Sequence, residues 1–152
     1  MNATPSQFIV FSLNDQTYGI EVSEIREVLG YRKITSLPNV QKFVKGIIHL
    51  RGGVLPVFDL REKFNMKAVD YTLFHVIIVV EIAGKLMGMI VDEISDVVTI
   101  FPENFQPTVN LVPGVKQEYL NGIGKYEDTM IILLNVDRLL TPEEIDMIDT
   151  IK

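Results

Sequence analysis

The most informative segment of the chain reads Phe43-Val-Lys-Gly-Ile-Ile-His-Leu-Arg-Gly-Gly-Val-Leu-Pro-Val-Phe-Asp-Leu-Arg-Glu-Lys-Phe64. It predicts two apolar strands, 46–51 and 54–59, joined by a glycine turn. A guanidinium cannot lose its proton, so Arg51, which stands among apolar residues, needs anionic or carbonyl partners. The sequence leaves two places open for Arg51: the rim of a groove or an internal ion pair.

The chain also contains an internal repeat. Gly19 and Gly88 are identical positions of two segments that align at a shift of 69 residues, and a later pair of segments aligns at a shift of 76. The aligned pairs are, in chain order, 8–13 with 77–82, 18–29 with 87–98, and 43–47 with 119–123. Three matches in the same order predict a duplicated unit, with an insertion in 101–113 of the second copy.

Each copy of the repeat is rich in predicted strands. Apolar runs bounded by turn residues indicate strands at 8–13, 17–22, 46–51, 54–59, 76–82, 86–91 and 129–136. About five short strands in each half are enough to close a small barrel. We therefore expect a mainly-β fold with two subdomains, about 14–66 and 76–140, related by an approximate twofold axis.

The end of the chain predicts a helix over 141–152. Thr141-Pro-Glu-Glu144 is a capping box with proline at the first helical position. Ile145, Ile148 and Ile151 recur at helical spacing, so one face of the helix is apolar. The structural interpretation is a short helix that docks on a barrel, and the alternative is a helix that binds a partner.

Composition excludes several classes of function. The 152 residues carry a net charge of −6, which disfavours nucleic acid and anionic membrane surfaces. The chain has no cysteine, so disulfides, thiol nucleophiles and thiolate metal sites are excluded. No apolar run approaches the length of a membrane span. We expect a cytoplasmic protein.

Catalytic patterns are weak. His49 and His75 lie far apart in the sequence, without the spacing of metal ligands. The acidic residues Asp92, Glu93 and Asp96 match no calcium loop, and we expect them on a solvated helical or turn face. A pair of carboxylates that meets only in the folded protein stays open. We expect no enzyme activity, no metal and no cofactor.

The string Lys-Gly-Ile-Ile-x-Leu-Arg-Gly-x-Val-Leu-Pro-Val-Phe-Asp-Leu-Arg over 45–61 resembles the core signature of the CheW-like domain family, adaptors of bacterial chemosensory arrays. The resemblance extends over residues 7–144. His49 stands where the family usually has Asn, and Gly53 adds a second glycine to the turn. The resemblance implies two tandem five-stranded SH3-like β-barrels that share a core, followed by a short C-terminal helix.

The resemblance also implies a function. It is that of a stand-alone, noncatalytic adaptor that couples chemoreceptors to a CheA-type histidine kinase. Such a protein is expected to be a monomer alone, and to assemble with its partners into receptor arrays at the inner face of the membrane. The competing interpretation is a small-molecule-binding β-barrel, or an enzyme on the same fold.

Two sets of contact residues follow from the resemblance. The residues expected to bind the receptor are Ile25, Glu27, Val28, Gly46, Arg51 and Gly52. Those expected to bind the regulatory domain of the kinase are Ile34, Val54, Gly88 and Leu111. From the residues alone, Ile25 and Val28 either cap the first barrel or form one wall of a groove. The glycines either shape turns or let a partner approach closely.

Overall fold

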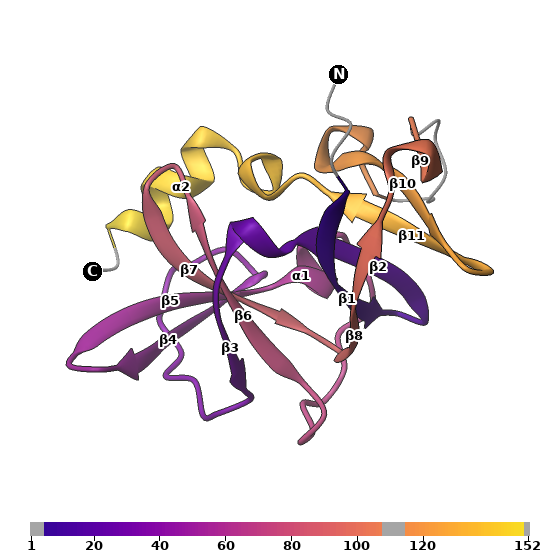
Figure 1. The fold of residues 1–152 in the computed structure, drawn as a ribbon. Helices are drawn as coiled ribbons and strands as arrows, with labels where there is room; N and C mark the ends of the chain where they lie inside the picture. The colour runs from indigo at the N-terminus through magenta and orange to yellow at the C-terminus, as the bar shows by residue number, and fades with distance from the viewer. Residues whose placement is uncertain (1–4, 108–114, 151–152) are drawn as a thin grey trace.

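A computed structural model describes residues 5–107 and 115–150, and its strands form two sheets (Figure 1). Sheet A has the order β8-β1-β2-β11-β10-β9 and contains β1 (Ser6–Leu13), β2 (Gln16–Glu21), β8 (Glu93–Ile100), β9 (Phe105–Gln106), β10 (Leu120–Tyr126) and β11 (Thr129–Leu134). Sheet B has the order β3-β6-β7-β5-β4 and contains β3 (Ile25–Gly30), β4 (Val44–Leu50), β5 (Gly53–Asp59), β6 (Val76–Ile82) and β7 (Lys85–Val91). The expectation of a mainly-β fold is confirmed.

Short helical segments connect and cover the strands. The α-helices are α1 (Leu60–Lys63) and α2 (Pro142–Asp149), and the 3-10 turns are η1 (Val22–Glu24), η2 (Pro102–Asn104), η3 (Gln117–Tyr119) and η4 (Val136–Arg138). The capping box that begins α2 is present, because the Glu144 N–H donates to Thr141 Oγ1 at 3.1 Å and the Thr141 N–H donates to Glu144 Oε1 at 2.8 Å. Ile145 and Ile148 are buried, so α2 docks on the protein by its apolar face. The third residue of the predicted apolar face, Ile151, lies outside the described residues.

The two sheets exchange strands between the halves of the chain. Sheet A combines the hairpin β1–β2 with β8 to β11, whereas sheet B combines β3 to β5 with the hairpin β6–β7. The expected boundaries 14–66 and 76–140 therefore do not coincide with the sheets. The reason is that β1 pairs with β8 and β3 pairs with β6, and such long-range antiparallel pairings leave no local signal in the sequence.

The strand registers confirm the duplication. Gly19 pairs with Val10 in sheet A, and Gly88 pairs with Val79 in sheet B. The parallel pairings agree as well, since Gly19 lies opposite Leu133 and Gly88 lies opposite Val57. Val79 and Gly88 of sheet B follow Val10 and Gly19 of sheet A by the shift of 69 residues. Leu133 of sheet A follows Val57 of sheet B by the shift of 76 residues. The two sheets are thus built on one plan.

Three apolar clusters make up the core of the described residues. Sheet B curves around Leu29, Ile48, Leu55, Val57, Ile77, Val79 and Ile90. Sheet A curves around Phe8, Val10, Val98, Ile100, Ile131 and Leu133. A third and larger cluster contains residues of both sheets and of α2, among them Tyr18, Val80 and Ile145. This central cluster is the shared core that was expected.

Four strands, β3, β8, β9 and β10, were absent from the sequence-based prediction. The segments after β2 and β7 were expected to be helical or turn-like, but they form β3 and β8. Both strands are bulged, between Ile25 and Glu27 in β3 and opposite Val10 and Phe11 in β8. A bulge interrupts the alternation of apolar and polar residues, so the period-two pattern of a strand is lost. Glu93 and Asp96 were expected on a helical or turn face, but they lie on β8, which is an edge strand of sheet A.

Candidate protein-binding surface

Arg51 lies at the tip of the β4–β5 hairpin. Leu50 pairs with Gly53, so the turn consists of Arg51 and Gly52 alone, with φ angles of 49° and 79°. Left-handed angles at both positions are typical of the two-residue turn that fits the twist of a hairpin. Gly53 is the first residue of β5 and does not lengthen the turn. His49 is exposed on β4 and pairs with Val54, so the hairpin closes with histidine at this position.

The Arg51 guanidinium forms an ion pair with the Glu27 carboxylate. Arg51 Nη1 donates to Glu27 Oε2 at 3.4 Å, and Nη2 makes a closer contact with Oε1. The Arg51 side chain is 63% exposed, so the pair lies on the surface. The internal ion pair that the sequence left open for Arg51 is therefore wrong, because the pair is on the surface. The rim of a groove stays a prediction.

Glu27 belongs to β3, at one edge of sheet B, whereas Arg51 follows β4, at the other edge. The ion pair therefore connects the two edges of a curved sheet. A bidentate contact between guanidinium and carboxylate also restricts the conformations of both side chains. The Glu27–Arg51 pair gives this end of sheet B a defined, charged surface.

Two exposed valines lie close to the ion-pair residues in the sequence. Val28 follows Glu27 on β3 and is 41% exposed, and Val54 follows the turn on β5 and is 39% exposed. Their neighbours Leu29 and Leu55 point into the core of sheet B. Since successive residues of a strand point to opposite faces, Val28 and Val54 point to the opposite face. By the same alternation Glu27 and Val28 point to opposite faces of β3, so the exposed valines and the ion pair are separate surface features of sheet B.

Other expected contact residues are less accessible. Ile25 is partly buried against the central cluster, and Ile34 is partly buried against the core of sheet B. Gly88 is buried in β7, where an added Cβ would lie 2.7 Å from Ile77 Cγ2. Gly88 therefore does not lie on a surface, because side chains of β5 and β6 enclose it. Leu111 lies outside the described residues.

The two glycines expected at the receptor surface have different surroundings. Gly52 is exposed in the turn. Gly46 is buried at a bulge of β4 with φ of 139°, and an added Cβ would lie 1.9 Å from the Thr35 carbonyl oxygen. That oxygen accepts a hydrogen bond from the Ile47 N–H at 2.9 Å. Gly46 thus allows the segment around Thr35 to cross β4 closely, which is a structural role.

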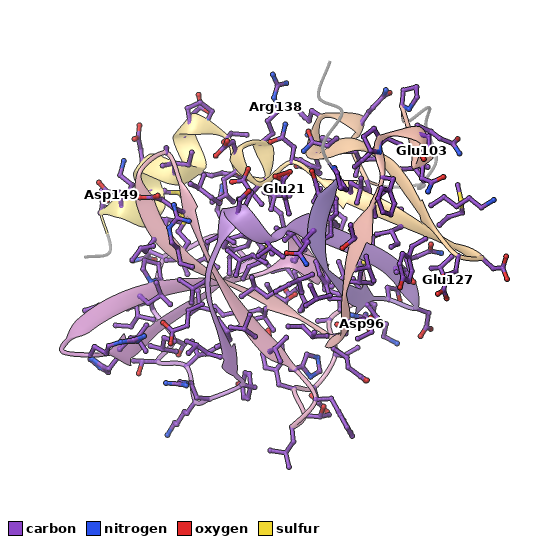
Figure 2. All side chains as sticks on the ribbon, viewed as in Figure 1. Glu21, Asp96, Glu103, Glu127, Arg138 and Asp149 are labelled. Atoms are coloured by element: carbon purple, nitrogen blue, oxygen red, sulfur yellow. The ribbon has the colours of Figure 1, made fainter. Side chains whose placement is uncertain are left out.

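The equivalent surface of sheet A carries different charges. The two repeat shifts place Asp96 at the position of Glu27 and Glu127 at the position of Arg51. Figure 2 labels both residues, Asp96 on β8 and Glu127 at the end of the β10–β11 hairpin. Val97 and Met130, which correspond to Val28 and Val54, are exposed as well. The sequence analysis did not select these four residues as contact residues, although the repeat shifts would have found them.

The sequence analysis also missed a buried polar network at the C-terminal end of β5, where Asp59 is the last residue of the strand. Asp59 accepts a hydrogen bond from the Glu62 N–H at 3.2 Å, which caps α1, and another from the Tyr71 hydroxyl. Burial raises the pKa of Asp59 above its ordinary value, and the hydrogen bonds from Tyr71 and Glu62 oppose that shift only in part. Burial also raises the pKa of Tyr71. This network fixes the segment between α1 and β6.

Within residues 5–107 and 115–150, no group of three or more His, Asp or Glu side chains is placed to hold a metal ion. His75 is buried, and its Nδ1 accepts a hydrogen bond from the Thr72 N–H at 2.9 Å. Apolar side chains fill the interior of each curved sheet. In the part of the chain that the structure describes, no helix is long and apolar enough to cross a membrane.

The fold and this surface define a class of double-sheet, mainly-β binding modules, and comparisons with known proteins specify the family. The family model described as CheW-like domain matches residues 7–144. The chain is 34% identical to the "Chemotaxis protein CheW" of Klebsiella aerogenes over 145 residues, which cover 95% of this chain and 87% of that protein. It is 33% identical to the "Probable chemotaxis protein CheW" of Rhizobium etli over 144 residues, which cover 95% and 93%.

A solved structure agrees with these relatives. The scaffolding protein TtCheW from Thermoanaerobacter tengcongensis superposes with a TM-score of 0.85 at 32% identity, and the alignment covers 93% of this chain and 96% of that one. The chain belongs to the CheW-like domain family.

Proposed function

We propose that this chain is a noncatalytic adaptor that couples chemoreceptors to a CheA-type histidine kinase in bacterial chemotaxis. The observation that carries the proposal is the family match over residues 7–144, together with relatives named chemotaxis protein CheW and a solved relative described as a scaffolding protein. The adaptor acts in the cytoplasm and is recruited to receptor arrays at the inner face of the membrane.

The exposed part of sheet B supports two neighbouring contact surfaces. The receptor surface consists of Glu27, Arg51, Gly52 and Val28, with Ile25 at its border. The surface for the regulatory domain of the kinase includes Val54 and Ile34, and Ile34 is partly buried against the core of sheet B. Leu111 stays assigned to the kinase surface as a proposal from the sequence. Gly46 and Gly88 support these surfaces from the interior.

Two contacts of modest strength are sufficient for such an adaptor. A molecule bound to a receptor holds its kinase-binding surface at a high effective concentration near other receptor-bound partners. Each interface can then be small, and it can combine a fixed ion pair with a few exposed apolar side chains. Neither contact requires a cofactor or a chemical step.

Co-sedimentation tests the proposal. Chemoreceptor cytoplasmic fragments are assembled into particles that sediment, and CheA-type kinase is added with and without this chain. We expect the kinase to enter the pellet in proportion to the amount of adaptor added. Kinase that sediments equally well without the adaptor would contradict the coupling role. An adaptor that binds neither protein would leave the competing interpretation, a small-molecule-binding barrel.

A further inference from the structure

His75 is a buried imidazole at the end of the turn that precedes β6. Its side chain is 8% exposed, and the Tyr71 ring packs against it edge to face at 5.2 Å between centroids. Figure 1 shows this turn at the bottom of the molecule, where β6 begins. Histidine is the side chain whose charge ordinarily changes near neutral pH, so the surroundings of its two ring nitrogens decide what acid does to this turn.

The contact of Nδ1 fixes the position of the proton in the neutral ring. The Thr72 N–H donates to His75 Nδ1 at 2.9 Å, so Nδ1 is an acceptor and carries no proton. The proton of the neutral imidazole therefore resides on Nε2. Nε2 is buried and forms no hydrogen bond within the part of the chain that the structure describes. The ring thus has one satisfied acceptor and one unsatisfied donor.

The Nε2 side of the ring lies near a carboxylate. Asp92 Oδ1 is 3.8 Å from His75 Nε2, which is too long for a hydrogen bond but within the range of an ion pair. Asp92 follows β7, and it accepts hydrogen bonds from Arg61 Nε at 3.2 Å and from the Asn14 N–H at 2.9 Å. Arg61 belongs to α1 and Asn14 to the β1–β2 turn. Asp92 is therefore held in place by two other segments and is ready to receive a charged imidazole.

The other titratable groups near the ring come from β3 and β5. The N–H of Tyr31, which follows β3, donates to the His75 carbonyl at 3.1 Å, and its ring packs on Tyr71 at 4.9 Å between centroids. The Tyr71 hydroxyl donates to Asp59 at the end of β5. Three exposed charged residues adjoin these two tyrosines in the sequence, namely Arg32, Lys33 and Asp70. Among the described residues, Asp92 is the carboxylate within ion-pair distance of the ring.

We propose that His75 is a pH-sensitive latch, and that its protonation shifts the ring toward Asp92 and opens the turn before β6. The step takes up one proton from water and breaks no covalent bond. The proton enters at Nδ1, which then cannot accept from the Thr72 N–H, so two donors face each other. The charged ring is attracted by Asp92, which it shares with Arg61. Thr72 Oγ1, 3.3 Å from Nδ1, is an acceptor for the new N–H.

The turn carries side chains whose presentation changes when the latch opens. Leu73 is 96% exposed and Phe74 is 71% exposed. The bond from the Thr72 N–H to Nδ1 joins the start of the turn to its end, and the Phe74 N–H donates to Thr72 Oγ1 at 3.2 Å. Loss of the first bond and competition for the second acceptor release both apolar side chains from a fixed turn. The latch is independent of the proposed contacts with receptor and kinase.

Nitrogen NMR spectra of the isotopically labelled chain test the position of the proton. Above neutral pH we expect the Nδ1 signal of His75 at the position of a non-protonated nitrogen and the Nε2 signal at that of a protonated one. The chain has one other histidine, His49, so His49→Asn assigns the signals. A neutral ring with its proton on Nδ1 would overturn the proposal, because Nδ1 could not then accept from Thr72.

Hydrogen exchange of the Thr72 amide tests the opening. Its protection, measured against an unstructured peptide at each pH, should fall about tenfold as the pH is lowered from about 8 to about 5. His75→Asn keeps an acceptor, because its side-chain oxygen is as many bonds from the backbone as Nδ1, but it cannot titrate. This variant should therefore keep its protection over the whole range. His49→Asn is the matched control and should respond like the wild type, since His49 is exposed on β4.

Asp92→Asn tests the partner of the charged ring. The substitution removes the negative charge, so the loss of Thr72 protection should move to a pH about one unit lower or more. Thr72 protection that loses its pH dependence at a higher pH than in the wild type, or at the same pH, would show that Asp92 does not hold the ring.

Two further results would overturn the proposal. One is Thr72 protection that does not change with pH in the wild type. The other is a loss of protection that persists in folded His75→Asn, which would assign the response to Asp59 and Tyr71. Circular dichroism establishes folding. If His75→Asn does not fold, the wild type alone decides, because the ring nitrogens of His75 and the Thr72 amide must then titrate with the same midpoint.

Discussion

Glu27 and Arg51 stand 24 residues apart and meet across the two edges of sheet B. The local sequence around either residue does not predict that they pair, because three other strands separate β3 from β4 in the sheet. The ion pair is the point at which the curvature of the sheet brings β3 to the tip of the β4–β5 hairpin. The ion pair is also the centre of the proposed receptor surface. Swapping the charges of Glu27 and Arg51 therefore tests how this surface binds the receptor.

Arg51→Ala should weaken receptor binding while the domain stays folded. An exposed ion pair contributes about 1 kcal/mol or less to stability, because water solvates both groups when the pair is broken. Loss of charge-assisted hydrogen bonds to a charged partner costs about 1.5–3 kcal/mol of binding free energy. Thermal melts and receptor co-sedimentation of the same variant measure the two effects. A large drop in melting temperature with unchanged receptor affinity would show that Arg51 acts in folding only.

Exchange of the two charges separates the ion pair from a direct receptor contact. Glu27→Arg combined with Arg51→Glu rebuilds the pair with reversed direction. If the pair only shapes the surface, the double variant should bind the receptor better than either single variant. If the receptor contacts Arg51 itself, all three variants should bind equally poorly. Titration of receptor fragment with each variant distinguishes these results.

Charges placed on the exposed valines should separate the two proposed partners. Val28→Glu should weaken the receptor complex and spare the kinase complex, and Val54→Glu should do the reverse. An uncompensated carboxylate in an apolar contact is costly, so a tenfold or greater loss of affinity is expected at about 1.4 kcal/mol per factor of ten. Two titrations for each variant measure this. Folded variants that lose both partners together would indicate one shared surface.

Gly46→Ala should destabilise the fold strongly. The added Cβ would meet the Thr35 carbonyl oxygen at 1.9 Å, and the φ of 139° is unfavourable for any side chain. We expect a loss of about 3 kcal/mol or more in the free energy of unfolding. Gly30→Ala is the matched control, since nothing lies within 4 Å of its added Cβ. Urea titrations that give both variants the stability of the wild type would refute the structural role of Gly46.

Asp59 should make the domain less stable as the pH rises. Its pKa is raised in the folded protein, mainly by burial, so the folded state holds the proton more tightly than the unfolded state does. The resulting stabilisation is complete below the ordinary value of 3.8 and is lost as the pH rises through the folded pKa. Asp59→Asn cannot titrate, so the wild type should lose stability relative to this variant over that interval. A difference in unfolding free energy that is constant with pH would contradict the assignment.

Much of the local structure follows from the sequence. The hairpins β1–β2, β4–β5 and β6–β7 join neighbouring strands by short turns. Turn residues between two apolar runs are therefore enough to predict them from the sequence. The capping box at Thr141 identifies the start of α2 for the same reason, since both of its partners lie within one helical turn. The repeat predicts that Gly19 and Gly88 occupy equivalent places, and the registers confirm it.

The sequence by itself determined the strands of the hairpins, the terminal helix, the duplication and the family. Tertiary structure alone decided which hairpin joins which sheet, that Gly88 is enclosed, and that Arg51 meets Glu27. The physical reason is that hairpin and helix signals act between residues a few positions apart. Pairing of β1 with β8 and of β3 with β6 instead depends on burying apolar faces of both halves in one central cluster, which no short segment encodes.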